Sequence, residues 1–423
     1  MKGLITSFPK NFWVVIIMEF FERGSYYGMM SVLALYLSSP ERGGVLGFSE
    51  KAIGLVMGII TPLLYLLPIF SGATAEKIGY KKMLIIAFSF LSIGYFLTGM
   101  MTSYYAVFLS LIIMALGAGM FKPIPSGTIA RITTQENSSL GFGIFYWSIN
   151  LGAFIFPLFL VNFLKTINWF YVFALSGSAT ALMLLVVIFL YKEPPKPENT
   201  KNIKEILVGI ITVLKDYKFI LMICIYSGFW ILYFQMFHTV LWYLKDFVDM
   251  SPVQDFVNHI FSTLKISYKF VFDVEHVTVL NAGTIITLQL IVSKIVNKMP
   301  ALPTMIGGIL LGTIGMACLA ISNYSWTFIT GIIIFSIGEM TTHPKFISYI
   351  GLIAPKDKVA LYMGYAFLYG VIGSSVGGLL GGYGYDYFIK HRGEPQTLWI
   401  LFSCIGLATI IGLLLFNKFI AKK

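Results

Sequence analysis

Three charged side chains stand close together within the first long apolar stretch of the chain. Glu19, Glu22 and Arg23 lie in the middle of the run from Phe12 to Leu37, which is long enough to cross a bilayer as a helix. Each charge would cost roughly 2.5 to 3.5 kcal/mol at the middle of a membrane, so such charges are tolerated only when they pair and face a cavity lined by protein or water. Their spacing of three and four residues predicts that all three project from one helical stripe.

The chemistry that this stripe favours is proton binding. The proton affinity of a buried carboxylate depends on whether a cation lies beside it, so making and breaking one ion pair can load and release a proton. Lys122 brings a second cation from another apolar stretch. Two glutamates and two cations carry no net formal charge, which suits a closed cluster. We therefore predict a proton-coupling site formed by Glu19, Glu22, Arg23 and Lys122.

Long apolar helices must position these residues. The chain has 423 residues, of which 57% are hydrophobic and only 12% are charged, and its mean hydropathy is +0.82. Apolar runs of about twenty residues follow one another from end to end, as expected of helices that each cross a bilayer. The pattern predicts an all-α membrane protein with about twelve transmembrane helices. It excludes a soluble enzyme.

A polar segment divides the predicted helices into two sets of six. The segment is rich in charge and proline where it begins, at Lys192-Glu-Pro-Pro-Lys-Pro-Glu-Asn. We expect an N-terminal six-helix bundle (1–191), a cytoplasmic linker (192–218) and a C-terminal six-helix bundle (219–423). This layout is similar to that of major facilitator transporters, whose site lies between the two halves. Residues 204–216 are expected to form a short surface helix, and residues 245–276 an external cap.

The charge distribution orients the chain in the membrane. The formal net charge of +11 at pH 7 could by itself suggest a nucleic-acid partner. With both termini in the cytoplasm, however, most of the 30 Lys and Arg residues fall on the inner side. The positive balance therefore predicts a multi-pass protein of the cell (plasma or inner) membrane with both termini cytoplasmic. Its partners would be the lipid bilayer, protons and a small-molecule substrate, with no role for nucleic acid.

Five motifs resemble those of the proton-dependent oligopeptide transporters, a branch of the major facilitators. One is the paired-glutamate and arginine motif of residues 19–23, followed by Ser25-Tyr26-Tyr27-Gly28-Met29. The others are Gly117-Ala-Gly119-Met-Phe-Lys122-Pro123, Phe145-Tyr146-Trp-Ser-Ile149-Asn150-Leu-Gly152-Ala153, Leu280-Asn281 and Gly338-Glu339. The resemblance implies the major facilitator fold of two six-helix bundles. It also implies a secondary active transporter that carries di- or tripeptides with protons by alternating access.

The resemblance further implies which residues bind the substrate. A dipeptide is a zwitterion, so its recognition requires a cation at one end and an anion at the other. Arg23, Lys122 and Tyr27 would bind the carboxylate, and Glu339 with Asn281 would bind the amino group. The implied contacts to the body of the peptide are Asn150, Tyr26 and Tyr65. The structural alternative for the Tyr and Asn residues is that they only form hydrogen bonds between helices, as buried Tyr and Asn often do.

Two positions depart from the family's pattern. Met30 stands where the family usually has a second arginine, and Phe234 stands where a glutamate is common. In the family these two positions are expected to face each other as an ion pair of the outer gate. Losing both replaces a salt bridge by an apolar contact, whereas losing one alone would strand a costly buried charge.

Two other functions remain open. One is a facilitator for another small solute, such as an amino-acid derivative, an organic anion or a drug, which would keep the proton cluster with altered specificity. The other is a nontransporting membrane receptor or scaffold. Glu19, Arg23 and Lys122 argue against the second, because a scaffold has no need to place charges in a cavity.

An enzyme is not expected, and neither is a cofactor or a metal site. The segment Gly373-Ser-Ser-Val-Gly377 fits a hydrolase pattern, but it lies in an apolar run rather than at a turn between a strand and a helix. Together with Gly378, Gly381 and Gly382 it predicts close packing of small residues between helices. The chain contains no Walker loop or zinc-protease motif.

Overall fold

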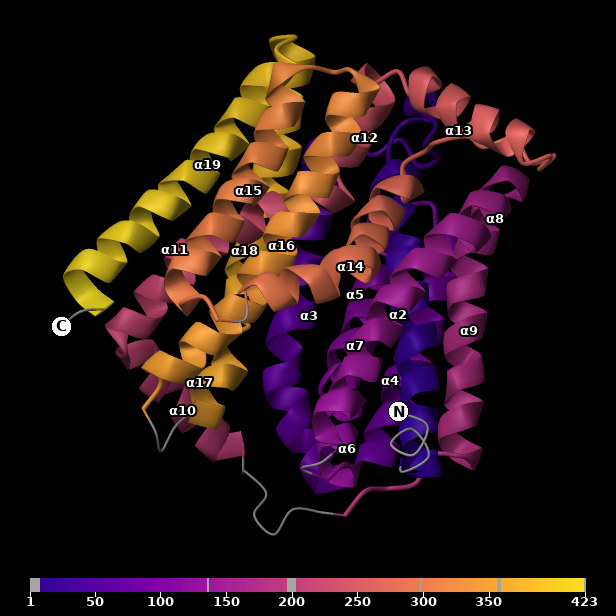
Figure 1. The fold of residues 1–423 in the computed structure, drawn as a ribbon. Coiled ribbons are helices and arrows are strands. Elements are labelled where there is room, and N and C mark those ends of the chain that lie inside the picture. The colour runs from indigo at the N-terminus through magenta and orange to yellow at the C-terminus, as the bar shows by residue number, and fades with distance from the viewer. Residues whose placement is uncertain (1–7, 135–136, 196–202, 297, 356–358, 422–423) are drawn as a thin grey trace. The chain divides into compact units, whose positions relative to one another are not determined.

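The structure, a computed structural model, describes residues 8–134, 137–195, 203–296, 298–355 and 359–421 (Figure 1). These residues are helical almost throughout, with no strand among them. Within these ranges ten helices are long and apolar enough to cross a membrane. Two further long helices are α2 (Lys10–Leu37), which carries Glu19, Glu22 and Arg23, and α16 (Ser325–Ile353), which carries Glu339. The prediction of an all-α membrane protein with about twelve spanning helices is confirmed.

The chain separates into two compact units. The first unit comprises Met1–Met29 and Ile59–Tyr217, and the second comprises Met30–Gly58 and Lys218–Lys423. The border between them passes through α2 and through α3 (Glu50–Ile78), so both helices contribute to both units. The division into residues 1–191, 192–218 and 219–423 stays a prediction.

Apolar helices with small residues at their contacts build the first unit. Gly94 of α4 lies against the backbone of Met114 on α5, and Ser92 of α4 donates a hydrogen bond of 2.9 Å to the carbonyl of Gly177 on α9. Besides its parts of α2 and α3, the unit contains α4 (Tyr80–Met100), α5 (Tyr104–Phe121), α6 (Pro123–Ile132), α7 (Ser138–Ile155), a π-helical turn η2 (Phe156–Val161), α8 (Asn162–Ile167), α9 (Trp169–Phe189) and α10 (Ile203–Lys215). The surface helix predicted in the linker is confirmed as α10, on which Val208 is exposed.

The second unit holds the remaining helices. Besides its parts of α2 and α3, it contains η1 (Pro40–Arg42), α11 (Tyr217–Phe234), η3 (Gln235–Phe237), α12 (Thr239–Phe247), α13 (Ser251–Thr263), α14 (Glu275–Val296), α15 (Ala301–Ile321), α16, α17 (Val359–Tyr365), α18 (Leu368–Gly384), η4 (Tyr385–His391), α19 (Pro395–Phe416) and η5 (Asn417–Ala421). α15 and α16 pack closely because Gly315 meets the backbone of Gly331 and Gly308 meets that of Gly338. The segment expected to form a cap contains α13.

Five glycines on α18, which we call the glycine seam, let neighbouring helices approach its backbone. A Cβ atom on Gly378 would lie 2.5 Å from the amide nitrogen of Gly58, and one on Gly382 would lie 2.5 Å from the carbonyl oxygen of Glu50. The remaining seam residues, Gly373, Gly377 and Gly381, face α11, η3 and the start of α12. The predicted packing of small residues between helices is therefore confirmed for this segment, which lies inside a helix and not at a nucleophile turn.

Candidate functional site

The charged residues of α2 form an ion-pair cluster in the first unit. Glu22 is fully buried, and the side chains of Glu19 and Arg23 are 6% and 11% exposed. The Arg23 guanidinium donates from Nη2 to Glu22 Oε1 at 2.8 Å and from Nε to Glu22 Oε2, so this pair is bidentate. Glu19 Oε1 lies 3.6 Å from Arg23 Nε, one helical turn away. The Arg23 guanidinium thus lies near two carboxylates, and that of Glu22 is the closer.

Two tyrosines extend the cluster along α2. The guanidinium carbon of Arg23 lies 5.2 Å from the centre of the Tyr26 ring, within the range of a cation–π contact. The rings of Tyr26 and Tyr27 meet edge to face at 5.3 Å, and Tyr27 also interacts electrostatically with Arg23. The structure thus brings Tyr26 and Tyr27 together with the charged residues on one side of the helix.

Lys122 joins the same cluster from the junction of α5 and α6. It directly precedes Pro123, whose fixed φ angle suits the first position of α6. The Lys122 ammonium nitrogen lies 4.0 Å from the centre of the Tyr65 ring on α3 and interacts electrostatically with all three charged residues of α2. Ser71 of α3 fixes the two helices by donating a 2.9 Å hydrogen bond to the carbonyl of Gly119 on α5. Tyr65 and Lys122, predicted from separate segments, therefore lie together.

Asn150 differs from the other residues predicted in this unit. It is 8% exposed on α7, a helix that packs closely on α2 because Gly152 meets the Phe20 carbonyl and Gly24. Its side-chain amide donates to the carbonyl of Tyr146 one turn earlier at 3.0 Å. This hydrogen bond of Asn150 stays within its own helix, so it is not the interhelical bond of the structural alternative, and among the described residues no hydrogen bond joins Asn150 to the charges of α2.

In the second unit, Glu339 is held by an amide from a neighbouring helix. Asn281 of α14 donates to Glu339 Oε2 and to Ser336 Oγ on α16, each at 2.9 Å. The Ser336 hydroxyl donates a hydrogen bond of 2.8 Å to the carbonyl of Ile332. The side chain of Glu339 is half-buried. The structure therefore brings together the two residues that were predicted to bind an amino group.

An aromatic group on three helices was missed by the sequence analysis. The rings of Trp230 on α11 and Tyr369 on α18 stack at 4.5 Å, and His343 lies 5.4 Å from Trp230 and 5.8 Å from Tyr369. His343 is one helical turn beyond Glu339 on α16. The sequence offers a signal only for His343, through its spacing from Glu339, because the other two rings come from distant segments.

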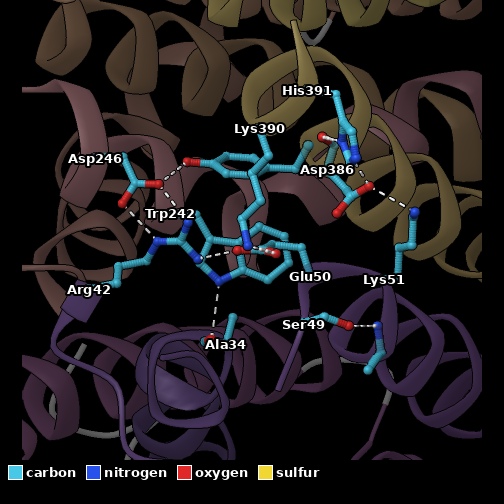
Figure 2. A network of polar contacts seen from close by, with 12 residues as sticks. Ala34, Arg42, Ser49, Glu50, Lys51, Trp242, Asp246, Asp386, Lys390 and His391 are labelled. Atoms are coloured by element: carbon cyan, nitrogen blue, oxygen red, sulfur yellow. Dashed lines mark hydrogen bonds and ion pairs between the residues drawn. The ribbon is translucent and has the colours of Figure 1, made fainter. Parts of the chain in front are cut away.

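A polar network of the second unit was also missed (Figure 2). Arg42 donates to both carboxylate oxygens of Asp246 at 2.7 Å and to Glu50 Oε1 at 2.6 Å. The Lys390 ammonium lies 2.6 Å from Glu50 Oε2, and the Tyr385 hydroxyl donates to Asp246 at 2.5 Å. We call these five residues the Arg42 network. Each is a single charged or polar residue near a helix end, so no local spacing in the sequence points to them.

Arg42 remains charged within this network. Its side chain is 9% exposed. Burial alone would lower the pKa of Arg42, but the hydrogen bonds that Arg42 donates to Asp246 and Glu50, together with the nearby Tyr385, raise it above its usual value. A bidentate guanidinium–carboxylate pair of this kind is among the stronger ionic contacts in proteins.

The two positions that depart from the family's pattern both lie in the second unit. Met30 is 3% exposed and Phe234 is 5% exposed. Burial of two apolar side chains is compatible with the apolar replacement of an ion pair. Their direct contact stays a prediction.

The described residues also bear on metal binding. Among them, no group of three or more His, Cys, Asp and Glu side chains is arranged to hold a metal ion. The three cysteines, Cys224, Cys318 and Cys404, are all free thiols.

Comparison with known proteins places this arrangement in a family. The family model described as Major Facilitator Superfamily matches residues 12–268 and 256–421, which together cover most of the chain. The chain belongs to the Major Facilitator Superfamily, a family of transporters, and is a multi-pass membrane protein.

Similar sequences are transporters of bacteria. The chain is 30% identical over 192 residues to a "Dipeptide and tripeptide permease B" of Photorhabdus luminescens, a match that covers 44% of this chain and 38% of that protein. It is 28% identical over 216 residues to the "Uncharacterized transporter YclF" of Bacillus subtilis, covering 48% and 44%. It is 26% identical over 231 residues to a "Di-/tripeptide transporter" of Lactococcus lactis, covering 50% and 44%. The matched region is thus less than half the length of these relatives.

Solved structures show the same fold. A mutant of a peptide transporter POT in complex with alafosfalin has a TM-score of 0.81 and 20% identity, and the match covers 98% of this chain and 95% of that one. A POT family transporter in complex with 5-aminolevulinic acid has a TM-score of 0.78 and 21% identity, covering 97% and 96%. These similarities confirm the predicted major facilitator fold.

Proposed function

We propose that the protein is a secondary active transporter of the proton-dependent oligopeptide branch, which imports di- or tripeptides together with protons. The observation that carries the proposal is the buried cluster in which Arg23 serves Glu22 and Glu19 while Lys122 interacts with all three. Buried charged residues in an apolar helix are typical of ion and substrate pathways. Relatives named as di- and tripeptide permeases or transporters support the choice of substrate.

The proton step follows from competition for Arg23. A substrate carboxylate that binds the guanidinium would displace one glutamate, and a glutamate without its cation binds a proton more readily. Release of the substrate would let the ion pair re-form and expel the proton. Glu19 and Glu22 are the proton carriers in this proposal, and Arg23 and Lys122 are the cations that control them.

The two ends of a peptide require opposite charges. In the proposal, Arg23, Lys122 and Tyr27 bind the carboxylate, and Glu339 positioned by Asn281 binds the ammonium group. Tyr26, Tyr65 and Asn150 contact the body of the peptide. The bidentate geometry of a guanidinium suits a carboxylate, and a carboxylate suits the three donors of an ammonium group.

The proposal includes an orientation in the membrane. Both termini and α10 are on the cytoplasmic side, and the chain is divided into a bundle of residues 1–191, a linker of 192–218 and a bundle of 219–423. With this orientation η1 and α13 are external. The Arg42 network then ties external segments of the second unit together.

Uptake into proteoliposomes tests the proposed function. A labelled dipeptide should accumulate with an inward proton gradient, and a protonophore should abolish the accumulation. Gradient-driven accumulation of a competing amino-acid derivative or organic anion, but not of the dipeptide, would favour the facilitator for another solute. Absence of both would favour a nontransporting protein.

Glu339→Gln tests the assignment of the amino end. Glutamine keeps an oxygen that accepts from Asn281, so the fold should be preserved while the negative charge is lost. Binding of peptides with a free amino terminus should weaken roughly tenfold to a hundredfold, because hydrogen bonds to charged groups contribute about 1.5 to 3 kcal/mol. Binding of the same peptides after N-acetylation should change little. Equal losses for both would assign Glu339 a structural role.

A further inference from the structure

Two fully buried hydroxyl groups of the first unit have no hydrogen-bond partner among the described residues. They are the hydroxyls of Ser25 on α2 and Tyr95 on α4, and both residues are 0% exposed. Thr98, one turn beyond Tyr95, avoids this cost by donating to the carbonyl of Gly94 in its own helix at 2.8 Å. A buried hydroxyl without a partner is unfavourable, so Ser25 and Tyr95 require an explanation.

Both hydroxyls come from the place where α2 and α4 meet α9. Ser176 of α9 donates at 3.2 Å to the carbonyl of Ser25, and the next residue, Gly177, accepts a hydrogen bond of 2.9 Å from Ser92 of α4. α2 and α4 thus meet α9 at adjacent residues. Tyr95 follows Ser92 by three residues, so the two lie on neighbouring positions of the α4 surface.

The packing of α4 directs Tyr95 into the interior of the first unit. Gly94 lies against α5 and Phe96 lies against α9, so Tyr95 stands between the two sides of α4 that are covered by these helices. The ring is accordingly inaccessible to solvent. Tyr95 interacts electrostatically with three residues of the α2 cluster: Glu22, Arg23 and Tyr26.

The carboxylate of Glu22 can accept hydrogen bonds beyond those from Arg23. Each of its two oxygens accepts one bond from the guanidinium, and a carboxylate oxygen has two lone pairs. In the proposed transport step a substrate carboxylate takes the guanidinium. Glu22 would then be a fully buried charge that has lost its cation, which is costly unless other donors replace the lost bonds.

We propose that Tyr95 is a positioning residue for the proton step, whose hydroxyl donates to Glu22 once Arg23 has turned to the substrate. Ser25, three residues after Glu22 on α2, offers a second donor at the same place. The inference rests on the proposed function and extends it. A hydroxyl that donates to a carboxylate stabilises its ionised form and so weakens proton binding. Tyr95 therefore lets Glu22 give its proton back to water while the substrate still holds Arg23.

The other groups that face Glu22 keep their charges when Tyr95 is changed. The charged ones are Glu19 and Arg23 on α2 and Lys122 at the junction of α5 and α6. The elements η2, α7 and α9 also pack on α2, and none of them contains Asp, Glu, Lys, Arg or His. Removing the Tyr95 hydroxyl thus tests one neutral hydrogen-bond donor.

Tyr95→Phe removes this donor and keeps the ring. The rate of dipeptide uptake into proteoliposomes would be measured against external pH at a fixed internal pH. Without the donor Glu22 binds its proton more tightly, so the midpoint of the pH profile should move to higher pH. A shift of about 1 to 2 units is expected for one hydrogen bond to a charged group. Exchange of labelled for unlabelled dipeptide should persist.

Tyr191→Phe is the matched control. Tyr191 is 2% exposed, and its hydroxyl shares a hydrogen bond of 2.7 Å with the hydroxyl of Thr128. This variant should melt at a lower temperature in detergent and keep the wild-type pH midpoint. Tyr95→Phe should melt at the wild-type temperature or above, because the hydroxyl that it removes has no partner. A lower melting temperature of Tyr95→Phe with an unchanged pH midpoint would overturn the inference.

A second readout requires no transport. In Arg23→Met, Glu22 has lost its cation, and its protonation can be followed by the infrared band of the carboxylic acid that disappears when Glu22→Gln is added. The midpoint of this band should lie about 1 to 2 pH units higher when Tyr95→Phe is added to Arg23→Met. Equal midpoints would overturn the inference even if dipeptides are transported. A shift in a protein that transports no dipeptide would support the inference for Tyr95 and refute the proposed function alone.

Discussion

Competition for one guanidinium is the central chemistry at the scale of single residues. Arg23 makes its shortest bonds to Glu22, while Glu19 stays 3.6 Å away. Removing either glutamate leaves the other to balance the charge. Arg23 therefore stabilises the ionised form of Glu22 more than that of Glu19. Re-forming the pair of Arg23 with Glu22 accordingly releases more free energy than re-forming its pair with Glu19.

Glu22→Gln should separate proton coupling from substrate movement. The glutamine oxygen can still accept from Arg23, but an amide carries no proton. Accumulation of dipeptide against its gradient should fall to the level of equilibration, whereas exchange of labelled for unlabelled dipeptide across the membrane should remain measurable. Both would be measured in proteoliposomes.

Glu41→Gln is the matched control, because Glu41 is an exposed carboxylate in the short turn η1. It should leave accumulation unchanged. Accumulation by Glu22→Gln at the wild-type level would remove Glu22 from the coupling step, and loss of exchange together with accumulation would assign it a role in binding.

Residues close in sequence were predictable, and residues paired across the chain were not. Glu19, Glu22 and Arg23 lie within one helical turn, so helical spacing alone brings them together. Arg42 and Asp246 are 204 residues apart, and nothing in either local sequence indicates the other. The participation of Lys122 followed from its being a cation within another apolar stretch rather than from spacing.

Close helix packing is the dominant physical feature at the scale of elements. The glycine seam of α18 leaves no room for a side chain at Gly378, since an added carbon would meet the backbone of Gly58. Backbone cannot move aside as a flexible side chain can. Overpacking of this kind typically costs about 1 to 3 kcal/mol.

Gly378→Ala should therefore lower thermal stability in detergent by about 1 to 3 kcal/mol. Gly307→Ala on α15 is a matched control, because a Cβ there meets no atom within 4 Å. That variant should be neutral or more stable by up to about 1 kcal/mol, since alanine restricts the unfolded chain. Equal stability of the two variants would mean that α18 can shift away from its neighbours at little cost.

The Arg42 network is expected to show energetic coupling between its members. Arg42→Gln and Asp246→Asn, measured singly and together by thermal unfolding, should give a coupling of about 1 to 3 kcal/mol, since both side chains are largely buried and directly bonded. The coupling should persist in high salt, which screens exposed pairs more than buried ones.

The pair Lys51–Asp386 provides the comparison. Its atoms are 2.8 Å apart, slightly farther than those of the network, but Lys51 is 45% exposed. Its coupling should be much smaller and should vanish in high salt. Additive effects of Arg42→Gln and Asp246→Asn would show that their bidentate contact contributes nothing to stability.

Helix breaks mark the limit of prediction at this scale. The long apolar run after Lys218 predicts a single spanning helix, yet the structure divides it into α11, η3 and α12. Between Tyr233 and Thr239 there is neither a proline nor a glycine to indicate a break. The break is made by tertiary contacts, in which Gln235 bonds to the glycine seam and His238 turns its ring back to cap α12.

Orientation in the membrane is a property of the whole molecule. Positively charged residues favour the cytoplasmic side, which places both termini inside and α13 outside in the proposal. The hydrophobic pattern by itself fixes the number of spans but not which side is which. Three positions exposed in the structure can decide it.

Cysteine labelling in intact cells would test the orientation. In a background with Cys224, Cys318 and Cys404 replaced, Asp255→Cys on α13 and Glu41→Cys in η1 should react with a membrane-impermeant maleimide. Glu205→Cys on α10 should react only after the cells are permeabilised. The opposite pattern would invert the proposed topology, and with it the direction assigned to transport.

The glycine seam also has a genetic consequence. Any substitution of a glycine introduces a residue with at least a Cβ atom, so these five positions have no conservative replacement. In a library of all single substitutions, intolerant positions should therefore recur along α18 at 373, at 377 and 378, and at 381 and 382, with a helical period. Such a stripe would identify the packed face of this helix from growth data alone, without any structure.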